Sequence, residues 1–125
     1  MDITLKLATI LSVNDALKQV IDDEAVTDVA LKFKLLTIAK TLENPVAHFE
    51  LLRNEKIKEF GQEDAQGTIA IDITDSTAMQ SFREAMETLM DAEVTLSLTK
   101  LKSQEVFNKG LSPEALVGLY EIMEE

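Results

Sequence analysis

The sequence predicts one α+β domain over residues 1–125, in which a small antiparallel or mixed sheet is packed by a long amphipathic helix or αα-hairpin and by shorter helices. Three observations predict this class. Runs near 2–7, 68–73 and 93–100 alternate apolar and polar residues, as half-buried strands do. A long segment before residue 61 repeats apolar residues at three- and four-residue steps, the spacing of an amphipathic helix. Cap and turn residues separate these segments.

The first predicted strand, residues 2–7, has one apolar face. Its two faces carry Ile3, Leu5 and Leu7 on one side and Asp2, Thr4 and Lys6 on the other. We expect this strand to pair with the strand at 93–100, because both are apolar on one face and need a neighbour. Ser12 or Asn14 can then cap a short helix that runs to about Ile21.

The dominant feature is an amphipathic segment from about Ala25 to Phe60. Its apolar positions keep helical spacing through Leu31, Leu35, Ile38, Leu42, Phe49 and Leu52, with Ile57 and Phe60 beyond. This pattern predicts a long helix or one arm of an αα-hairpin. Gly61 follows Phe60 and is suited to a left-handed C-terminal cap.

Pro45 leaves two possibilities for this segment. Proline has no backbone N–H and disfavours helical geometry at the preceding residue, Asn44. Either one helix kinks at Pro45, or Asn44 caps a second helix that has Pro45 in its first position.

The second half of the chain is predicted to alternate strands and helices. After a polar, acidic turn, Ile69, Ile71 and Ile73 lie on one side of a strand over 68–73. Thr74 or Asp75 can cap the next helix. That helix extends to about Asp91, and its predicted buried stripe is Met79, Phe82, Met86 and Leu89.

The last predicted strand, residues 93–100, has Val94, Leu96 and Leu98 on one face. A helical turn over 103–108 is stopped by Gly110, and Ser112 followed by Pro113 is a strong start signal for a final helix. The packing face predicted for that helix is Leu116, Leu119, Tyr120 and Met123.

The charge of the chain bears on its partners. Twelve Lys and Arg stand against 23 Asp and Glu, a formal net charge of -11. A nucleic-acid binder or a protein held on an anionic membrane needs the opposite sign, so we expect neither nucleic acid nor membrane as a partner. Solubility explains such a charge in most proteins. The alternative is an acidic inhibitor that occupies a basic groove of a host protein.

The residues that usually carry chemistry are sparse. The chain has no Cys and a single histidine, His48, whose helical neighbours at three or four residues include no charged partner. No phosphate loop, calcium loop or nucleophile elbow is present. Asp72 and Asp75 flank a helix start, and capping and solvation explain Asp75 better than a metal site does. We therefore expect no enzyme activity, no cofactor and no metal site.

Apolar and aromatic side chains are the better functional candidates. The predicted interface residues are Phe49, Phe60, Phe107, Tyr120 and Met123. Aromatic residues and methionine are favoured where proteins meet. The competing interpretation is that all five fill the core; the functional one is self-association or docking of a partner along the long helix.

Residues 49–61, Phe-Glu-Leu-Leu-Arg-Asn-Glu-Lys-Ile-Lys-Glu-Phe-Gly, carry a resemblance to a known group. With the acidic turn to Gly67, Phe82 and Leu89 on the next helix, and the Leu111-Ser112-Pro113 ending, the chain resembles small uncharacterised proteins of tailed bacteriophages and prophages. The sequence departs from that pattern at Phe60, where Tyr is usual, at Pro45 and in a shortened turn. The resemblance supplies no catalytic residues.

The resemblance implies a viral origin and action in the cytoplasm of a bacterial host, with incorporation into the virion as a further expectation. Together with the apolar faces it predicts a non-enzymatic protein that acts by contact with a phage or host protein. A small virion or assembly component is the first hypothesis, and homo-oligomers are expected because small viral proteins commonly build symmetric assemblies.

Overall fold

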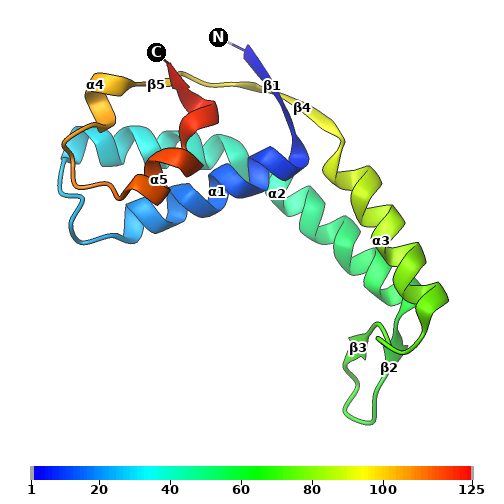
Figure 1. The fold of residues 1–125 in the computed structure, drawn as a ribbon. Coiled ribbons are helices and arrows are strands. Elements are labelled where there is room, and N and C mark those ends of the chain that lie inside the picture. The colour runs from blue at the N-terminus through cyan, green and yellow to red at the C-terminus, as the bar shows by residue number, and fades with distance from the viewer. Residues whose placement is uncertain (1, 125) are drawn as a thin grey trace.

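The chain forms an elongated molecule with a helical body at one end and a two-helix arm at the other (Figure 1). The computed structural model describes residues 2–124. In chain order the elements are β1 (Asp2–Lys6), α1 (Leu7–Asp22), α2 (Val29–Phe60), β2 (Gln62–Glu63), β3 (Ile69–Ala70), α3 (Ser76–Met90), β4 (Glu93–Ser97), β5 (Leu101–Lys102), α4 (Ser103–Val106), α5 (Pro113–Gly118), the 3₁₀ turn η1 (Tyr120–Ile122) and β6 (Met123–Glu124). The α+β class predicted from the sequence is confirmed.

The pairing predicted between the strands at 2–7 and 93–100 is confirmed for Asp2–Lys6 and Glu93–Ser97, where the second strand ends three residues earlier than predicted. β1 pairs antiparallel with β4 in a register that sets Thr4 opposite Thr95. The hydroxyl oxygens of these two threonines lie 2.9 Å apart on the outer face. The inner face carries Ile3 and Leu5 of β1 and Val94 and Leu96 of β4 toward the helices.

The predicted single sheet is wrong in one respect, because the described strands form three separate pairs. The strand expected over 68–73 shortens to β3, which pairs with β2 in a hairpin at the tip of the arm. Ile73 is 83% exposed there. The isoleucine alternation predicts a strand, but no layer of the fold lies beside the tip to bury its apolar face.

Helix α1 begins earlier than the sequence predicts. It follows β1 directly at Leu7, and the expected cap residues Ser12 and Asn14 lie inside it. Leu7 fits both periodicities: it ends the strand alternation, and its N–H donates to the carbonyl of Ala92 at 2.8 Å, yet its side chain also starts the buried helical face. That face is Leu7, Ile10, Val13, Ala16, Leu17 and Val20.

Helix α2 is continuous through Pro45, which settles the alternative left by the sequence. Asp28 caps its start by accepting a hydrogen bond from Leu31 N at 2.9 Å. The predicted apolar face is confirmed at its buried positions, Leu31, Leu35, Ile38, Leu42 and Phe49, whereas Leu52 is 41% exposed. Burial of α2 therefore ends shortly after Pro45.

The end of α2 differs from the predicted cap. Gly61 is extended, with φ -90° and ψ 172°, so a left-handed cap is the wrong prediction. Glycine is required for space instead, since a Cβ at this position would lie 2.3 Å from the carbonyl oxygen of Ile57. The chain passes so close because it turns directly into β2 at the arm tip.

The arm consists of the C-terminal half of α2, the β2–β3 hairpin and α3. Asp75 caps α3 as predicted, by accepting from Ala78 N at 3.1 Å. α3 packs against α2 alone along most of its length, so no side chain of Ser76–Met90 is fully buried. The predicted stripe of Met79, Phe82, Met86 and Leu89 is half-buried.

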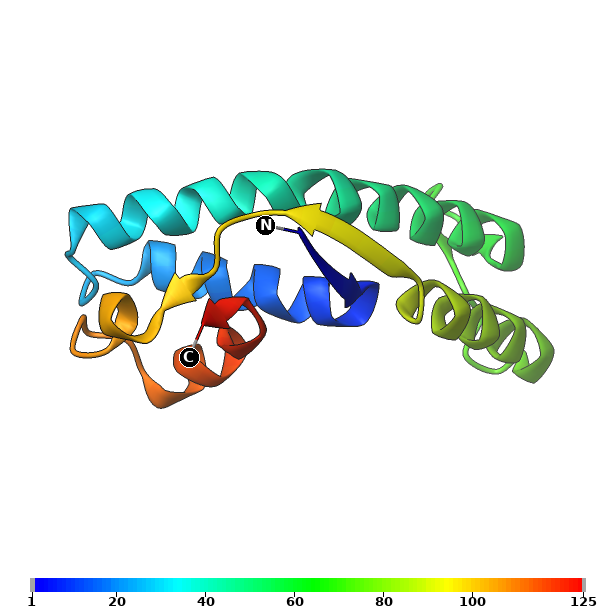
Figure 2. The ribbon, with the colours of Figure 1, turned by 90° about the horizontal axis from the view of Figure 1, so that it is seen from above.

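The core lies where α1 crosses the N-terminal half of α2 and the C-terminal segment closes over both (Figure 2). Its fully enclosed side chains come from four parts of the chain and include Ile10, Leu17, Leu35, Leu42, Leu101, Leu119 and Ile122. The strand pair β1–β4 lies over this core at the root of the arm. Burial is thus concentrated in the body.

We predict that Leu42→Ala lowers the free energy of unfolding by about 2–5 kcal/mol, because it leaves a cavity at a fully enclosed site. Leu51→Ala is the matched control on the same helix. Leu51 is 60% exposed, so the change should stay within about 0.5 kcal/mol. Urea titration followed by circular dichroism measures both. Equal losses at the two positions would contradict this assignment of the core.

We predict that Pro45→Ala raises the free energy of unfolding by about 1–3 kcal/mol, because alanine restores the backbone donor to the carbonyl of Thr41 and removes a ring from a helix interior. Asn44→Ala, at the exposed neighbouring position, should change it by less than about 0.7 kcal/mol. The same titration applies. A loss of stability in Pro45→Ala would mean that the ring contributes more by packing than it costs the helix.

Candidate functional site

A hollow of about 480 Å³ lies in the body beside the C-terminal strand. It lies between β5, the start of α4, and the η1–β6 segment. Its lining residues are Lys100, Ser103, Phe107, Tyr120, Glu121, Met123 and Glu124. An apolar floor edged by charges of both signs is a surface suited to another polypeptide.

The 3₁₀ turn η1 explains why Tyr120 faces outward. Residues three apart lie above one another in such a turn, and Leu119 and Ile122 are both completely buried. Tyr120 falls on the opposite side and is 63% exposed. The helix predicted to continue here ends at Gly118, so the prediction that Tyr120 packs inward is wrong.

Two glycines let the C-terminal segment approach the body closely. Gly110 has φ +90°, and a Cβ there would lie 2.5 Å from the carbonyl oxygen of Ala25. Gly118 packs α5 on α1, since a Cβ would lie 2.6 Å from that of Ala16. Between them Ser112 caps α5 as predicted, by accepting from Ala115 N at 3.1 Å. The segment that forms the hollow is therefore held against α1.

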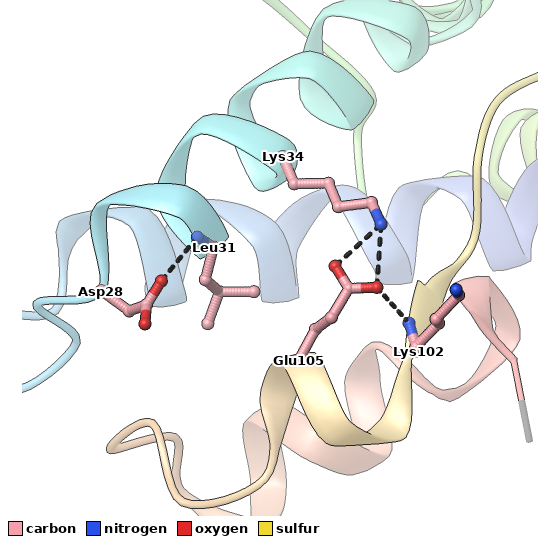
Figure 3. Close-up of polar contacts among 5 residues, drawn as sticks. All are labelled: Asp28, Leu31, Lys34, Lys102 and Glu105. Carbon is pink, nitrogen blue, oxygen red and sulfur yellow. Dashed lines mark hydrogen bonds and ion pairs between the residues drawn. The ribbon is translucent and has the colours of Figure 1, made fainter.

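A polar clamp fixes the other wall of the hollow to α2 (Figure 3). Lys34 Nζ of α2 donates to both carboxylate oxygens of Glu105 in α4, at 2.9 and 2.8 Å. The same carboxylate accepts the N–H of Lys102 at 3.2 Å. A second pair lies nearby, where Lys109 Nζ donates to Asp28 Oδ2 at 2.8 Å while Oδ1 of that cap accepts from Leu31.

These contacts change the titration of the two carboxyl groups. The hydrogen bond from Lys34 lowers the pKa of Glu105 below its ordinary value, and the Lys102 N–H acts in the same direction. The hydrogen bond from Lys109 lowers the pKa of Asp28, with the N–H of Leu31 adding to it. Both carboxylates are therefore ionised at neutral pH, and the clamp is made of charged pairs.

The structure brings three of the five predicted interface residues together. Phe107, Tyr120 and Met123 all line the hollow, and Phe107 is 49% exposed. Phe49 lies apart from them, buried on α2 beneath the guanidinium of Arg53, which is 5.7 Å from the ring centre. Phe60 ends α2 in the arm, half-buried, with Lys56 Nζ 5.8 Å from its ring centre.

A second concave surface, here called the root groove, lies where the arm leaves the body. It has a volume of about 420 Å³. One wall is α2, another is β4, and the end of α3 closes it; the lining residues are Leu7, Thr41, Asn44, Pro45, His48, Phe49, Leu52, Leu89, Ala92, Val94, Thr95 and Leu96. His48 is exposed on the α2 wall.

One exposed apolar stripe was not predicted as a candidate surface. Val29, Phe33 and Leu36 on the outer face of α2 are 81%, 73% and 53% exposed. Their spacing of four and three residues marks one helix face, opposite the buried positions Leu31 and Leu35. The sequence contains that spacing. Because both faces of the helix are apolar here, the sequence does not indicate which face packs against the rest of the protein.

The acidic side chains and His48 were predicted to form no metal or catalytic site. Within residues 2–124, no three His, Asp or Glu side chains converge in a way that could hold a metal ion. Asp72 accepts from the hydroxyl and the N–H of Thr74 in a tight turn before α3. None of the helices over the same described range is long and apolar enough to cross a membrane.

No protein-family profile, curated protein or solved structure matches this chain.

We predict that Glu105→Gln lowers stability at neutral pH, with the difference from the wild type shrinking in acid. A carboxyl whose pKa is lowered by folding stabilises the native state above its unfolded pKa of about 4.3 and loses that contribution as the pH falls through the lower folded value. Urea titrations between pH 7 and pH 3 measure the difference. A gap that is constant with pH would show that the Lys34–Glu105 pair adds nothing by its charge.

Proposed function

We propose that this protein acts without catalysis, by contacting another protein, as a small virion or assembly component encoded by a tailed phage. The observation that carries the proposal is the hollow beside β6, where Phe107, Tyr120 and Met123 lie together with two of them half-exposed or more. The phage origin rests on the resemblance of residues 49–61 and their surroundings.

The chemistry of the hollow supports a protein partner. Tyrosine and phenylalanine place a large rigid area on a partner at low entropic cost, and tyrosine is enriched among residues that dominate binding energy. Methionine adapts its shape to a partner side chain. Lys100, Glu121 and Glu124 at the edge provide both signs of charge for a polar rim.

The rigidity of the hollow also supports recognition. Leu119 and Ile122 anchor the η1 turn in the core, and the Lys34–Glu105 pair holds α4 on α2. A backbone that is held in place before binding loses less entropy on binding, so more of the contact energy is realised as affinity. This arrangement favours a specific docking surface.

A photo-crosslinking residue in place of Tyr120 tests the proposal in cells of the native host during infection. Position 117 is the matched control, because Val117 is 76% exposed on the adjacent α5 but does not line the hollow. We expect one phage-encoded or virion protein to be captured several-fold more at 120 than at 117. Purified virions are then examined by mass spectrometry for the chain itself.

The binding energy is tested with the captured partner in purified form. Tyr120→Ala should weaken binding by about 2 kcal/mol or more, roughly 30-fold, while Val117→Ala should leave it within about 0.5 kcal/mol. Equal capture at both positions, or no loss of affinity in Tyr120→Ala, would contradict the assignment of the hollow.

A second candidate function, an acidic inhibitor of a host protein, is favoured by the arm tip. Residues 59–75 hold five exposed acidic side chains, Glu59, Glu63, Asp64, Asp72 and Asp75, and no Lys or Arg. A basic host surface would be attracted to it, and that attraction is screened by salt. Binding that survives high salt and depends on Tyr120 would favour the first function over this one.

A further inference from the structure

The sheet at the root of the arm is incomplete. β4 pairs with β1, and no other described strand lies against it. Figure 2 shows β4 on the side of β1 that faces α2, and residues of β4 and α2 together line the root groove. Two-stranded pairs are marginal by themselves, and an unpaired edge is a template for another strand.

The hydrogen-bond pattern shows which groups of β4 are free at this edge. Leu7 N donates to the carbonyl of Ala92, in the register that sets Thr4 opposite Thr95. Directly hydrogen-bonded pairs alternate along an antiparallel ladder, so Leu5–Val94 and Ile3–Leu96 are bonded pairs. The N–H and C=O groups of Glu93, Thr95 and Ser97 therefore point away from β1.

The root groove continues this edge. Val94, Thr95 and Leu96 of β4 form one of its walls, and across from them lie Pro45, His48 and the 41%-exposed Leu52 of α2. A strand added to β4 would lie over the groove and cover these side chains. Its inward-facing residues would extend the apolar face that Val94 and Leu96 already present.

We propose that two copies of this chain pair antiparallel through β4, joining their β1–β4 pairs into one four-stranded sheet. The backbone N–H and C=O groups that point away from β1 belong to the odd-numbered residues Glu93, Thr95 and Ser97. They can bond between the copies only in registers that place odd-numbered residues opposite one another. The register centred on Thr95 is the one that overlaps all five residues of β4. It sets Val94 against Leu96 of the second copy and Thr95 against its own counterpart.

The charge pattern of β4 allows a second copy as the occupant, because no like charges face one another across the new strand pair. Glu93 is the one charged residue of β4, and in this register it faces Ser97 of the second copy rather than another Glu93. Lys6 lies opposite Glu93 on its other side, in the β1 strand of the same copy. The centre of the interface is then neutral, although each chain carries a net charge of -11.

Two-fold symmetry adds contact area to the strand pair itself. A stable interface buries about 1,200–2,000 Å² in total, more than five paired residues provide. A two-fold axis at Thr95 would place the β4 strand of each copy beside the root groove of the other, adding apolar contact to the five paired residues. This dimer uses a different surface from the C-terminal hollow, so the proposed function can fail without affecting it.

Cysteine cross-linking of the full chain tests the axis directly, because the natural sequence has no Cys. In Thr95→Cys the two sulfhydryls would meet at the axis, within the Cα spacing of about 4.4–6.8 Å that a disulfide requires. Thr4→Cys is the matched control on the same outer face, one strand away in each copy. With glutathione disulfide as oxidant we expect a covalent dimer from Thr95→Cys and monomer from Thr4→Cys.

Proline variants test the hydrogen bonds. The N–H groups of Thr95 and Thr4 both point away from the β1–β4 ladder, so proline at either position removes no bond within one copy. Sedimentation equilibrium should show the wild type changing from monomer to dimer between about 10 μM and 1 mM. Thr95→Pro should weaken the dimer at least about 10-fold and Thr4→Pro less than about 3-fold.

High salt should strengthen the wild-type dimer, because it screens the repulsion between two acidic chains. Circular dichroism establishes whether each variant folds. If a proline variant does not fold, the comparison of Thr95→Cys with Thr4→Cys still tests the dimer. A wild type that remains at 13.9 kDa up to about 1 mM overturns the proposal. Cross-linking of Thr4→Cys as readily as Thr95→Cys overturns it as well.

Discussion

The packing of α1 on the N-terminal half of α2 is the interaction on which the rest of the molecule depends. Ile10, Leu17, Leu35 and Leu42 have no exposed surface, and the C-terminal segment gains its own burial only by closing over them. α1 has 16 residues and α2 has 32, about 24 and 48 Å at 1.5 Å per residue. The shorter helix cannot cover the longer one.

This difference in length produces the arm. Beyond Pro45, α2 is covered by α3 from one side, so the two helices share half-buried rather than buried faces. The hairpin at the tip has no layer beneath it. The root groove forms where the buried half of α2 gives way to the half that only α3 covers, between the last buried turn of α2 and the strand β4. The C-terminal hollow has another origin. It forms because the Lys34–Glu105 pair and the close glycine contacts hold a short irregular segment against the body.

Much of the fold could be predicted from local patterns in the sequence. The strand at 2–7 and its pairing with 93–97, the caps Asp75 and Ser112, and the buried face of α2 all follow from periodicity and capping chemistry. These features are decided within a few residues. The early start of α1 could not be predicted, because Leu7 satisfies the strand and the helix pattern equally well.

Features set by distant packing were not predictable from the sequence. Apolar spacing on α3 and at 68–73 indicates which side chains share a face, but it does not say whether another element covers that face. The same limit applies to the candidate site. Sequence reasoning selected Phe107, Tyr120 and Met123 by residue type; that they line one hollow depends on a 3₁₀ turn and on an ion pair spanning 71 residues, Lys34–Glu105.

Hydrogen–deuterium exchange resolved by residue can show whether one end of α2 is anchored in a core and the other is not. We expect amides of α1 and of residues 31–42 to open only with global unfolding, and those of α3 to open at a free energy about 2 kcal/mol or more below it. Equal protection in α3 and α1 would mean that arm and body unfold as one unit, and α2 would then have no separately anchored end.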